Sequence, residues 1–595
     1  MAETILSLFR RNALRLGETP CLHYKEANQW KSLSWVDTEE LVRRYALGLS
    51  GLGLRAGDRV GLWSKTRMEW TLLDLAILAN QSITVPIYHT LISEQAAYIL
   101  QDAKVSMLIL EEPSQWEKIK PYLKDWKGPV ILLQGEGAGF VSLQQLKEKA
   151  KGLPVNLYDE NLRQLKPLTT ATYIYTSGTT GQPKGVLLTH RNILAEVQSL
   201  QEVFQFNADS VGFMILPLAH VVARAMQFYQ LAEGCQSAYV ENLDMVGINL
   251  LEVRPHFMAV VPRLLEKMNE KILATVQKSS KTVQNLFNWS LKVGREVSEL
   301  KQKKLRVPHH LKFRYFLATA LVFRKIRKGL GGRLQCLISG GAPLSKESAQ
   351  FLHAIGISVL EGYGLTETFA AITLNRPDDF RFGTVGKPLE GVRIKIAGDG
   401  EVCVKGDTVF VGYYNLKKET EEAFDPEGWF LTGDIGEFTK DGFLRITDRK
   451  KDMIKTSGGK YIAPQSIESL MQQSHYIQQI MVYGDGKKYL TALVTLNWDV
   501  VEDYARQNHL EYHSRKDLAH HPKIIQLVRK EIDEKNGHLS SFETIKKFAI
   551  LSSNFSIESG ELTPTLKVKR KEVTKKYRDI LDQLYNNEIQ EIRGP

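Results

Sequence analysis

The sequence predicts an α/β protein that consists of a large N-terminal domain and a smaller C-terminal α/β domain. Between Val36 and Leu110, segments alternate in the order helix, strand, helix, strand, helix, strand. Short apolar runs bounded by Gly or Pro recur later, as PVILLQ from Pro129 and RLQCLIS from Arg333. This alternation is typical of mostly parallel sheets covered by helices. A chain of 595 residues is also too long for one core, because domains usually hold roughly 100–200 residues.

The first predicted element is an amphipathic helix in the N-terminal sequence MAETILSLFRRNALRLGE. Arg10, Arg11 and Arg15 interrupt its apolar stretch, which argues against a signal peptide. A strand is expected in RVGLWS from Arg59, followed by a helix in MEWTLLDLAILA. No apolar run of about 18 residues occurs in the sequence, so we predict no segment that spans a bilayer.

A change of pattern near Asp448 predicts the boundary between the two domains. The charged cluster DRKKD begins at Asp448, and a fresh α/β pattern follows it to the C-terminus. We therefore expect an N-terminal domain at 1–448 and a C-terminal domain at 449–595.

The composition excludes several classes of protein. With 43% hydrophobic and 24% charged residues, the chain is neither disordered, nor a collagen-like fibre, nor a coiled coil. The four cysteines stand far apart and form no CxxC pair, so neither a disulfide framework nor a zinc ribbon is expected. We predict a reduced, cytoplasmic location, with association to a membrane as a further possibility.

The positive charge is concentrated in one segment, 271–333. This segment holds 16 Lys or Arg and two acidic residues, while the whole chain has a net charge of +11. Three interpretations remain open: peripheral contact with an anionic membrane, a solvated basic helix packed on its own domain, or docking of an acidic acyl carrier protein. No nucleic-acid-binding motif accompanies the segment, so no nucleic acid is expected as a partner. Apolar residues recur in it at helical spacing, at Leu311, Phe313, Tyr315, Phe316, Leu321, Phe323 and Ile326.

A loop suited to polyphosphate follows a short strand that ends at Thr176, in YIYTSGTTGQPKGVLLTHRN from Tyr173. Its glycines let backbone N–H groups approach a ligand closely, its hydroxyls add hydrogen-bonding groups, and its lysine adds a positive charge. It is not a Walker A loop, because Pro183 and Gly185 flank the lysine where that motif requires Gly and Ser or Thr. A plain Ser/Thr/Gly-rich hairpin turn is the alternative. The candidate phosphate contacts are Thr176, Ser177, Gly178, Thr179, Thr180, Gly181 and Lys184.

This loop resembles the signature phosphate-binding loop of the adenylate-forming (AMP-binding) superfamily. Further motifs follow in the order of that family: LPLAH from Leu216, SGGAPL from Ser339, EGYGLTET from Glu361, GEVCVKGDTVFVGYYN from Gly400, GWFLTGD from Gly428, DRKKDMIKTSGGKYIAP from Asp448 and LTPTLKVKR from Leu562. The resemblance covers essentially the whole chain. It implies a large multi-subdomain N-terminal adenylate-forming domain and a small mobile C-terminal domain. It also implies activation of a carboxylate with ATP and Mg²⁺.

The motifs EGYGLTET and SGGAPL supply candidate nucleotide contacts. The ring of Tyr363 offers a face for a purine, and Thr366 can donate to the α-phosphate. Glu367, together with Thr176, is the candidate ligand of Mg²⁺, because a carboxylate is a hard oxygen ligand. An adenine wall is expected from Gly340, Gly341 and Ala342, unless this is only a strand-to-helix turn. The remaining candidates of the motif are Glu361, Gly362 and Gly364.

The later motifs supply a ribose site and a hinge. Asp434 can accept hydrogen bonds from ribose hydroxyls, and Arg449 can approach the same ribose or the phosphates. The resemblance implies that the C-terminal domain moves between two half-reactions, with Lys451 as the hinge.

Two further residues are expected next to the reacting carboxylate. The resemblance implies a catalytic lysine near the C-terminus, and Lys567 is its best match, with Lys569 as the rival. His220, in LPLAH, would line the site beside the carboxylate, or be a buried structural histidine. An aromatic gate found near there in some long-chain relatives is not carried over, because Arg224 stands one helical turn after His220.

The resemblance lies within the long-chain acyl-CoA synthetase and acyl-ACP synthetase branch. The expected reaction is formation of acyl-AMP from a long-chain fatty acid, followed by transfer to coenzyme A. Transfer to acyl carrier protein is the alternative. A catalytically silent, membrane-bound fatty-acid binding partner is a more remote one. The preferred chain length and the oligomeric state stay open.

Overall fold

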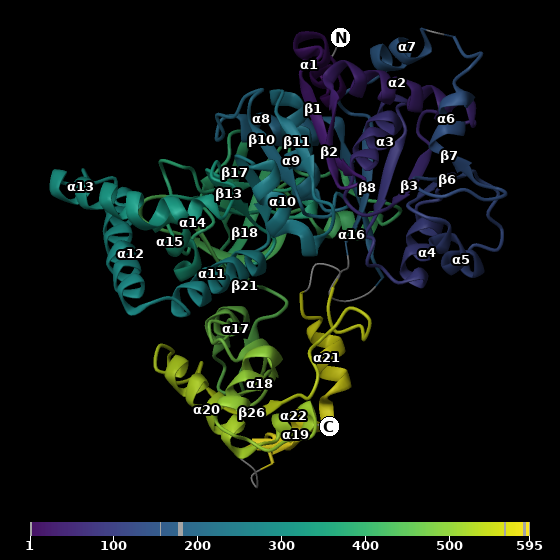
Figure 1. Cartoon of the computed structure of the whole chain (residues 1–595). Coiled ribbons are helices and arrows are strands. Elements are labelled where there is room, and N and C mark those ends of the chain that lie inside the picture. The colour runs from purple at the N-terminus through teal and green to yellow at the C-terminus, as the bar shows by residue number, and fades with distance from the viewer. Residues whose placement is uncertain (1–2, 155, 177–181, 564–566, 587–590, 594–595) are drawn as a thin grey trace.

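The structure is a computed structural model that describes residues 3–154, 156–176, 182–563 and 567–586, and the backbone of 591–593. Figure 1 shows a large N-terminal part, coloured purple to green, and a smaller C-terminal part, coloured light green to yellow, below it.

A mostly parallel sheet runs through the middle of the N-terminal part. Strands β1, β11, β10, β12, β13 and β14 are joined by parallel pairings, whereas β2, β15 and β16 are attached antiparallel. Over the described ranges the order of its nine strands is β16 (Lys387–Pro388), β15 (Thr373–Leu374), β14 (Ser358–Tyr363), β13 (Cys336–Ser339), β12 (Phe257–Val260), β10 (Val211–Met214), β11 (Gln236–Tyr239), β1 (Pro20–Glu26) and β2 (Gln29–Ser34).

A second sheet contains the segment whose alternation was used to predict the fold class. The predicted order from Val36 to Leu110 is confirmed, because α2 (Trp35–Gly51), α3 (Met68–Ala79) and α4 (Ser93–Asp102) alternate with parallel strands. Among the described residues the order of its eight strands is β19 (Gly412–Tyr413), β9 (Lys184–Thr189), β8 (Thr170–Thr176), β4 (Ile83–Ile87), β3 (Arg59–Trp63), β5 (Met107–Leu110), β6 (Val130–Leu132) and β7 (Val141–Ser142).

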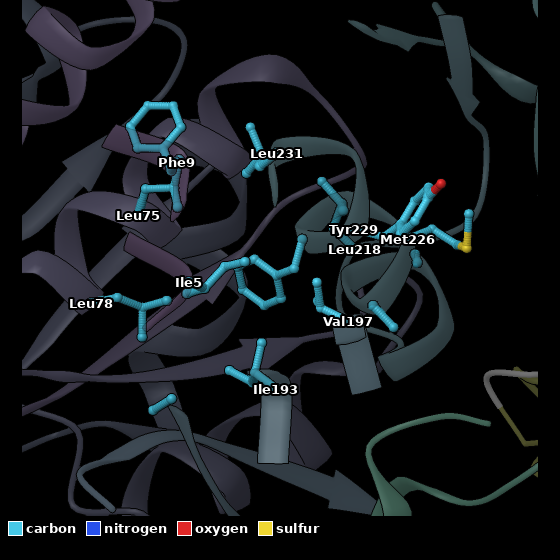
Figure 2. Packing of buried hydrophobic residues seen from close by; sticks show 14 of the residues in the cluster. Ile5, Phe9, Leu75, Leu78, Ile193, Val197, Leu218, Met226, Tyr229 and Leu231 are labelled. Carbon is cyan, nitrogen blue, oxygen red and sulfur yellow. The ribbon is translucent and has the colours of Figure 1, made fainter. Parts of the chain in front are cut away.

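Helices fill the space between these sheets. The predicted N-terminal helix is confirmed as α1 (Ile5–Leu16), capped by the Thr4 side chain, and it buries Ile5 and Phe9. Side chains of α1, α3, α8 (His190–Gln201) and α9 (Val221–Glu233) pack together in the main core (Figure 2). Further helices are α5 (Pro113–Ile119), α6 (Leu143–Lys149), α7 (Leu157–Gln164), α10 (Val246–Val253), α15 (Lys346–Ala354) and α16 (Lys417–Glu422).

A third sheet leads into the C-terminal part. It consists of the antiparallel strands β17 (Val392–Ile396), β18 (Glu401–Gly406), β20 (Phe430–Phe438) and β21 (Leu444–Arg449). Beyond β21, the hairpin β22 (Ile454–Lys455) and β23 (Tyr461–Ile462) precedes a separate sheet of β24 (Ile477–Tyr483), β25 (Leu490–Leu496), β26 (Ile545–Ile550) and β27 (Glu591–Arg593). Its helices are α17 (Pro464–Met471), α18 (Trp498–Gln507), α19 (Arg515–Ala519), α20 (Pro522–Asn536), α21 (Arg570–Lys576) and α22 (Arg578–Gln583).

The basic segment is helical and extends to one side of the molecule (Figure 1). It comprises the end of α11 (Pro262–Gln277), then α12 (Lys281–Gln302), α13 (His309–Ala318), a π-helical turn (Thr319–Phe323) and α14 (Arg324–Lys328). Helix α12 packs tightly on α15, because a Cβ at Gly294 would lie 2.5 Å from the carbonyl oxygen of Ala354.

Several of the apolar residues predicted at helical spacing do not enter the core. Phe323 is fully buried and Leu311 is 5% exposed, whereas Phe313 is 63%, Phe316 65% and Leu321 57% exposed. None of the helices that the structure describes is long and apolar enough to cross a membrane.

Candidate active site

The predicted phosphate loop connects two paired strands. Thr176 ends β8 and Lys184 begins β9, and these residues are partners in the antiparallel register. Because directly opposite residues of an antiparallel pair share one face of the sheet, both side chains lie on the same side. The strand end predicted at Thr176 is confirmed. Five further candidate phosphate contacts lie outside the described residues: Ser177, Gly178, Thr179, Thr180 and Gly181.

The motifs SGGAPL and EGYGLTET follow neighbouring parallel strands, β13 and β14, so they meet at one edge of the sheet. Backbone segments are close there. A Cβ at Gly364 would lie 1.5 Å from the carbonyl oxygen of Ala370, and one at Gly340 would lie 3.5 Å from that of Gly362. Gly364 is therefore required by the path of the chain. The expected adenine wall of Gly340, Gly341 and Ala342 leads out of β13 at this edge.

Glu361 fastens these two motifs to each other. Its Oε1 accepts a hydrogen bond from the backbone N–H of Leu344 at 3.1 Å. Burial raises the pKa of Glu361 to about 8, so the carboxyl group is mostly protonated at neutral pH. Glu361 Oε1 therefore positions the segment that follows β13 through its hydrogen bond to Leu344.

Tyr363, Asp434 and Arg449 form one connected group at the candidate ribose site. The Tyr363 hydroxyl donates to Asp434 Oδ2 at 2.6 Å, and Arg449 Nε lies 3.2 Å from Asp434 Oδ1. Asp434 and Arg449 are opposite each other on β20 and β21. Burial raises the pKa of Asp434 above its usual range, and the Arg449 charge counteracts that rise. The geometry holds a carboxylate in place where sugar hydroxyls could donate to it.

Glu367 is held by a residue to which the sequence motifs gave no role. The Tyr413 hydroxyl donates to Glu367 Oε1 at 2.9 Å, and Lys184 Nζ lies 5.2 Å from the centre of the Tyr413 ring. Tyr413 thus links the candidate metal ligand to the lysine of the phosphate loop. Its aromatic ring in the quoted segment GYYN was the signal that could have indicated it.

The donor set around Glu367 fits a magnesium ion that takes most of its ligands from phosphate and water. Burial raises the pKa of Glu367, and a nearby cation would favour the ionised form. Among the described residues, no group of three or more His, Cys, Asp or Glu could hold a metal ion. Mg²⁺ is commonly bound by one or two carboxylates plus substrate phosphates, which agrees with this arrangement.

His220 caps the helix that follows it. Its Nδ1 accepts a hydrogen bond from Val222 N at 3.2 Å at the start of α9, and its ring meets Tyr88 edge-on with 6.4 Å between centres. Burial, assisted by the positive charge of Lys567, lowers the pKa of His220 to about 4. The imidazole is therefore neutral at physiological pH and has no charge to offer a carboxylate.

Lys567, from the C-terminal part, lies near Arg449, Asp434 and His220 of the candidate active site. Partial burial and repulsion from Arg449 lower its pKa to about 8, while the charge of Asp434 acts in the opposite direction. The side chain keeps solvent-exposed surface, so it does not lie in a core. Lys569 instead precedes α21, and its backbone N–H donates to the carbonyl of Glu561. The arrangement favours Lys567 over Lys569 as the lysine of the site.

Lys451 lies exposed in the turn between β21 and β22. The adjacent Lys450 is anchored to the N-terminal part, 2.6 Å from Asp399 Oδ2 and 2.7 Å from Glu401 Oε2. Before the turn, buried Asp448 of β21 accepts a hydrogen bond from Gln465 N, at the start of α17 in the C-terminal part, at 3.0 Å. Lys450 and Lys451 are both exposed in this turn, but only Lys450 has an ion pair with the N-terminal part among the described residues.

Arg224 occupies the core and not a gate. It is fully buried, lies 2.7 Å from Asp74 Oδ1, and donates to the Thr172 hydroxyl at 2.8 Å. Its guanidinium also lies 5.5 Å from the centre of the Trp70 ring. This buried ion pair fastens α9, and with it His220, to α3 and β8.

The likeness to known proteins covers both parts of the chain. The family model described as AMP-binding enzyme matches residues 9–414, and that of the AMP-binding enzyme C-terminal domain matches residues 451–589. The chain belongs to the AMP-binding enzyme family. The resemblance inferred from the motifs is thereby confirmed.

Curated relatives of this AMP-binding enzyme are similar along nearly their whole length. The long-chain-fatty-acid–CoA ligase FadD15 of Mycobacterium bovis is 36% identical, over 94% of this chain and 93% of the relative. The long-chain-fatty-acid–CoA ligase ACSBG2 of Xenopus laevis is 33% identical, over 98% and 84%. Long-chain-fatty-acid–CoA ligase 1 of Cavia porcellus is 30% identical, over 98% and 86%.

Solved structures confirm the fold class of a large N-terminal adenylate-forming domain and a C-terminal domain. The anthranilate CoA ligase AuaEII in complex with anthranoyl-AMP has a TM-score of 0.72 at 18% identity, with 98% of both chains covered. The adenylation domain of a carboxylate reductase from Mycobacterium chelonae has a TM-score of 0.75 at 20% identity, over 98% of this chain and 91% of that one.

Proposed function

We propose that this protein converts long-chain fatty acids to their coenzyme A thioesters through an acyl-adenylate, with ATP as the energy source. The observation that carries the proposal is the approach of Lys567, from the C-terminal part, to Asp434, Arg449 and His220 at the carboxyl edge of the central sheet. The names of the curated relatives support the long-chain fatty acid and the coenzyme A.

In the first half-reaction, a carboxylate oxygen of the fatty acid attacks the α-phosphorus of ATP. A new oxygen–phosphorus bond forms, the bond to pyrophosphate breaks, and negative charge grows on the α-phosphoryl oxygens. Lys184 and Lys567 supply positive charge there, and the Thr366 hydroxyl supplies a donor. Neutral His220 lines the place of the carboxylate without adding a charge that would stabilise the ground state.

The nucleotide is held by groups that are already connected to one another. Asp434, fixed by Tyr363 and Arg449, accepts from the ribose hydroxyls, and the segment of Gly340, Gly341 and Ala342 lies against adenine. Mg²⁺, when bound, neutralises charge on the phosphate oxygens, and Glu367 and Thr176 are the residues that would hold it. Tyr413 keeps Glu367 in position for that task.

In the second half-reaction, the thiol of coenzyme A attacks the acyl carbonyl, a thioester forms and AMP leaves. No side-chain nucleophile is needed, because both nucleophiles are substrates. The C-terminal part turns about Lys451 between the two steps, which withdraws Lys567 and admits the thiol. The relatives cited above are named for coenzyme A, and they give no support to acyl carrier protein as the acceptor.

Pyrophosphate release with ATP and palmitate tests the activity directly, followed by the product mass with coenzyme A or acyl carrier protein supplied. Release together with palmitoyl-CoA is the expected result. Transfer only to the carrier protein would overturn the coenzyme A assignment. Absence of pyrophosphate across a series of chain lengths would mean that the protein is a silent binding partner.

We also propose peripheral contact with anionic membranes through the segment 271–333. Exposed Phe313 and Phe316 on α13 lie within the segment that carries 16 of the chain's basic residues, a combination that suits the interface of an anionic bilayer.

Co-sedimentation with phosphatidylglycerol vesicles tests this contact. The double variant Phe313→Ser and Phe316→Ser should bind several-fold less protein to the vesicles. The matched control, Leu168→Ser with Val411→Ser, changes two residues of similar exposure elsewhere and should bind as the parent protein does. Equal loss in both variants, or in neither, would contradict the proposal.

A further inference from the structure

A polar hollow lies at the edge of the central sheet opposite to the candidate active site. It has a volume of about 460 Å³. His256 and Gln335 immediately precede β12 and β13, and Ser358 begins β14, so the hollow lies at the amino ends of three parallel strands. Arg327 of α14 and Arg333 complete its lining. The candidate nucleotide-binding residues lie at the carboxyl ends of β13 and β14. The hollow and the candidate active site are therefore at opposite edges of the sheet.

Several hydrogen-bond donors that line the hollow have no acceptor among the described residues. Within the described part of the chain, the guanidinium of Arg327 and the hydroxyl of Ser358 have no hydrogen-bond or ion-pair partner. His256 Nδ1 accepts from the backbone N–H of Val211 at 2.9 Å, which places the proton of the neutral ring on Nε2. The donor capacity is therefore concentrated on one small surface.

Arg333 is held in place by backbone hydrogen bonds, and Arg327 lies against the main chain. Arg333 Nε donates to the carbonyl of Arg254 at 2.7 Å and Nη2 to that of Val253 at 3.2 Å, which leaves Nη1 available. A Cβ at Gly356 would lie 3.2 Å from Arg327 Nη1, so this guanidinium lies close against the main chain. Gly356 also has a φ of +89°, a conformation that favours glycine. Arg333 is thus oriented by two backbone carbonyls although it is solvent-exposed, and Arg327 is half-buried beside Gly356.

The charge of the hollow selects an anion. Its lining contains two guanidinium groups and no acidic residue, and the neutral imidazole of His256 adds a hydrogen-bond donor. Arginine in particular binds phosphate oxygens through paired N–H groups, and hydroxyl and imidazole donors complement it around a tetrahedral oxyanion. We propose that this hollow binds a phosphate group, either of a small phosphate compound or of a phospholipid head group. The second source is reasonable because α14 belongs to the basic segment.

Calorimetric titration with inorganic phosphate, with AMP at saturation to occupy the nucleotide site, tests the proposal. The double variant Arg327→Gln with Arg333→Gln should weaken phosphate binding at least tenfold. The control, Lys325→Gln with Lys328→Gln, makes the same change of charge on the same helix outside the hollow, and should bind as the parent protein does. Circular dichroism and pyrophosphate release confirm that each variant is folded and active.

A parallel arm distinguishes the two sources of phosphate. Vesicles of phosphatidylglycerol and of phosphatidylcholine are compared for the same two variants, with Phe313 and Phe316 left intact. Loss of vesicle binding in the arginine variant alone assigns the hollow to a lipid head group, and loss of free phosphate binding alone assigns it to a soluble compound. Unchanged binding in both arms, or equal loss in the lysine control, would overturn the proposal.

Discussion

The charge state of Lys567 is set by the residues around it. Partial burial and the Arg449 guanidinium lower its pKa from 10.5 to about 8, within the range of ordinary assays. The lysine is positively charged below that pKa and neutral above it. Because the transition state of adenylation gains negative charge, only the charged form contributes to its stabilisation.

Adenylation by this protein should therefore lose efficiency as the pH rises through about 8. The kcat/KM for ATP reports groups of the free enzyme, so its alkaline limb should follow the pKa of Lys567. Lys567→Arg, which stays charged, should remove that limb. Lys567→Ala should lower the rate of pyrophosphate release by about 10²–10³-fold, the usual effect of removing one transition-state donor. Stopped-assay measurements from pH 6.5 to about 9.5 check both expectations.

Two controls make this result specific. Lys569→Ala should leave the pH profile unchanged, because Lys569 lies at the start of α21. Lys567→Ala should also spare thioester formation from supplied acyl-AMP. A loss of equal size in the two half-reactions would refute the assigned role. The sequence favoured Lys567 over Lys569, and the charges of Arg449 and Asp434 around Lys567 support that choice.

The segment that follows β14 is held in an unusual conformation. Phe369 and Ala370 have φ values of +47° and +96°, directly after the one-turn helix that carries Thr366 and Glu367. Glu196, fully buried on α8, accepts a hydrogen bond from the backbone N–H of Ala371 at 2.9 Å. Burial raises the pKa of Glu196 well above its usual range, which favours the neutral carboxyl group. Strained backbone of this kind persists only when neighbouring groups fix it.

Glu196 should therefore act as a positioning residue for Thr366 and Glu367. Glu196→Leu removes the acceptor of Ala371 N–H and should lower kcat of adenylation by roughly tenfold, the equivalent of one buried hydrogen bond to a neutral group. It should also raise the Mg²⁺ concentration needed for half-maximal rate. Measurements of pyrophosphate release against Mg²⁺ concentration, at matched circular dichroism, check this.

Glu196→Gln provides the rescue test. Glutamine is neutral and keeps an oxygen acceptor in the same place for the Ala371 N–H, so this variant should retain near-parental kinetics. A Leu variant with unaltered Mg²⁺ dependence, or a Gln variant as impaired as Leu, would refute the positioning role.

The elements themselves were more predictable from sequence than the contacts between them. The alternation from Val36 to Leu110 is a local pattern, and it is confirmed segment by segment. The buried Arg224–Asp74 pair joins residues 150 positions apart, and no local pattern carries that information. The Tyr413–Glu367 bond likewise depends on β19 pairing with β9. The apolar spacing of the basic segment predicted helices correctly, but it could not show that Phe323 is buried whereas Phe313 is exposed.

Polar side chains join the two parts of the molecule at described residues away from the turn of Lys451. Gln473 Nε2 donates to Glu347 Oε2 at 3.1 Å, and Arg263 Nη2 donates to Gln478 Oε1 at 2.6 Å. These polar contacts hold the C-terminal part where Lys567 meets the nucleotide site. Polar contacts that are exposed or only partly buried are readily exchanged for water, so these two contacts are suited to opening.

A reversible cross-link between the two parts tests whether they must separate. The variant Glu347→Cys with Gln473→Cys, joined by a short disulfide-containing bismaleimide, fixes the contact that brings Lys567 to the site. All four native cysteines are buried, so the reagent should react at the introduced pair. The linked protein should still release pyrophosphate from ATP and palmitate in a single turnover. Its formation of palmitoyl-CoA should fall at least tenfold, because the thiol cannot enter while Lys567 occupies the site.

Cleavage of the linker with dithiothreitol should restore thioester formation to the rate of the unlinked double variant. The single variant Gln473→Cys, treated with the same reagent, controls for modification without a bridge. If the linked protein formed palmitoyl-CoA at the unlinked rate, one arrangement of the two parts would serve both half-reactions, and Lys451 would have no role as a hinge. Loss of pyrophosphate release on linking would instead mean that this arrangement is not the one that performs adenylation. Because the two half-reactions are measured separately, each outcome shows which of them this arrangement of the two parts supports.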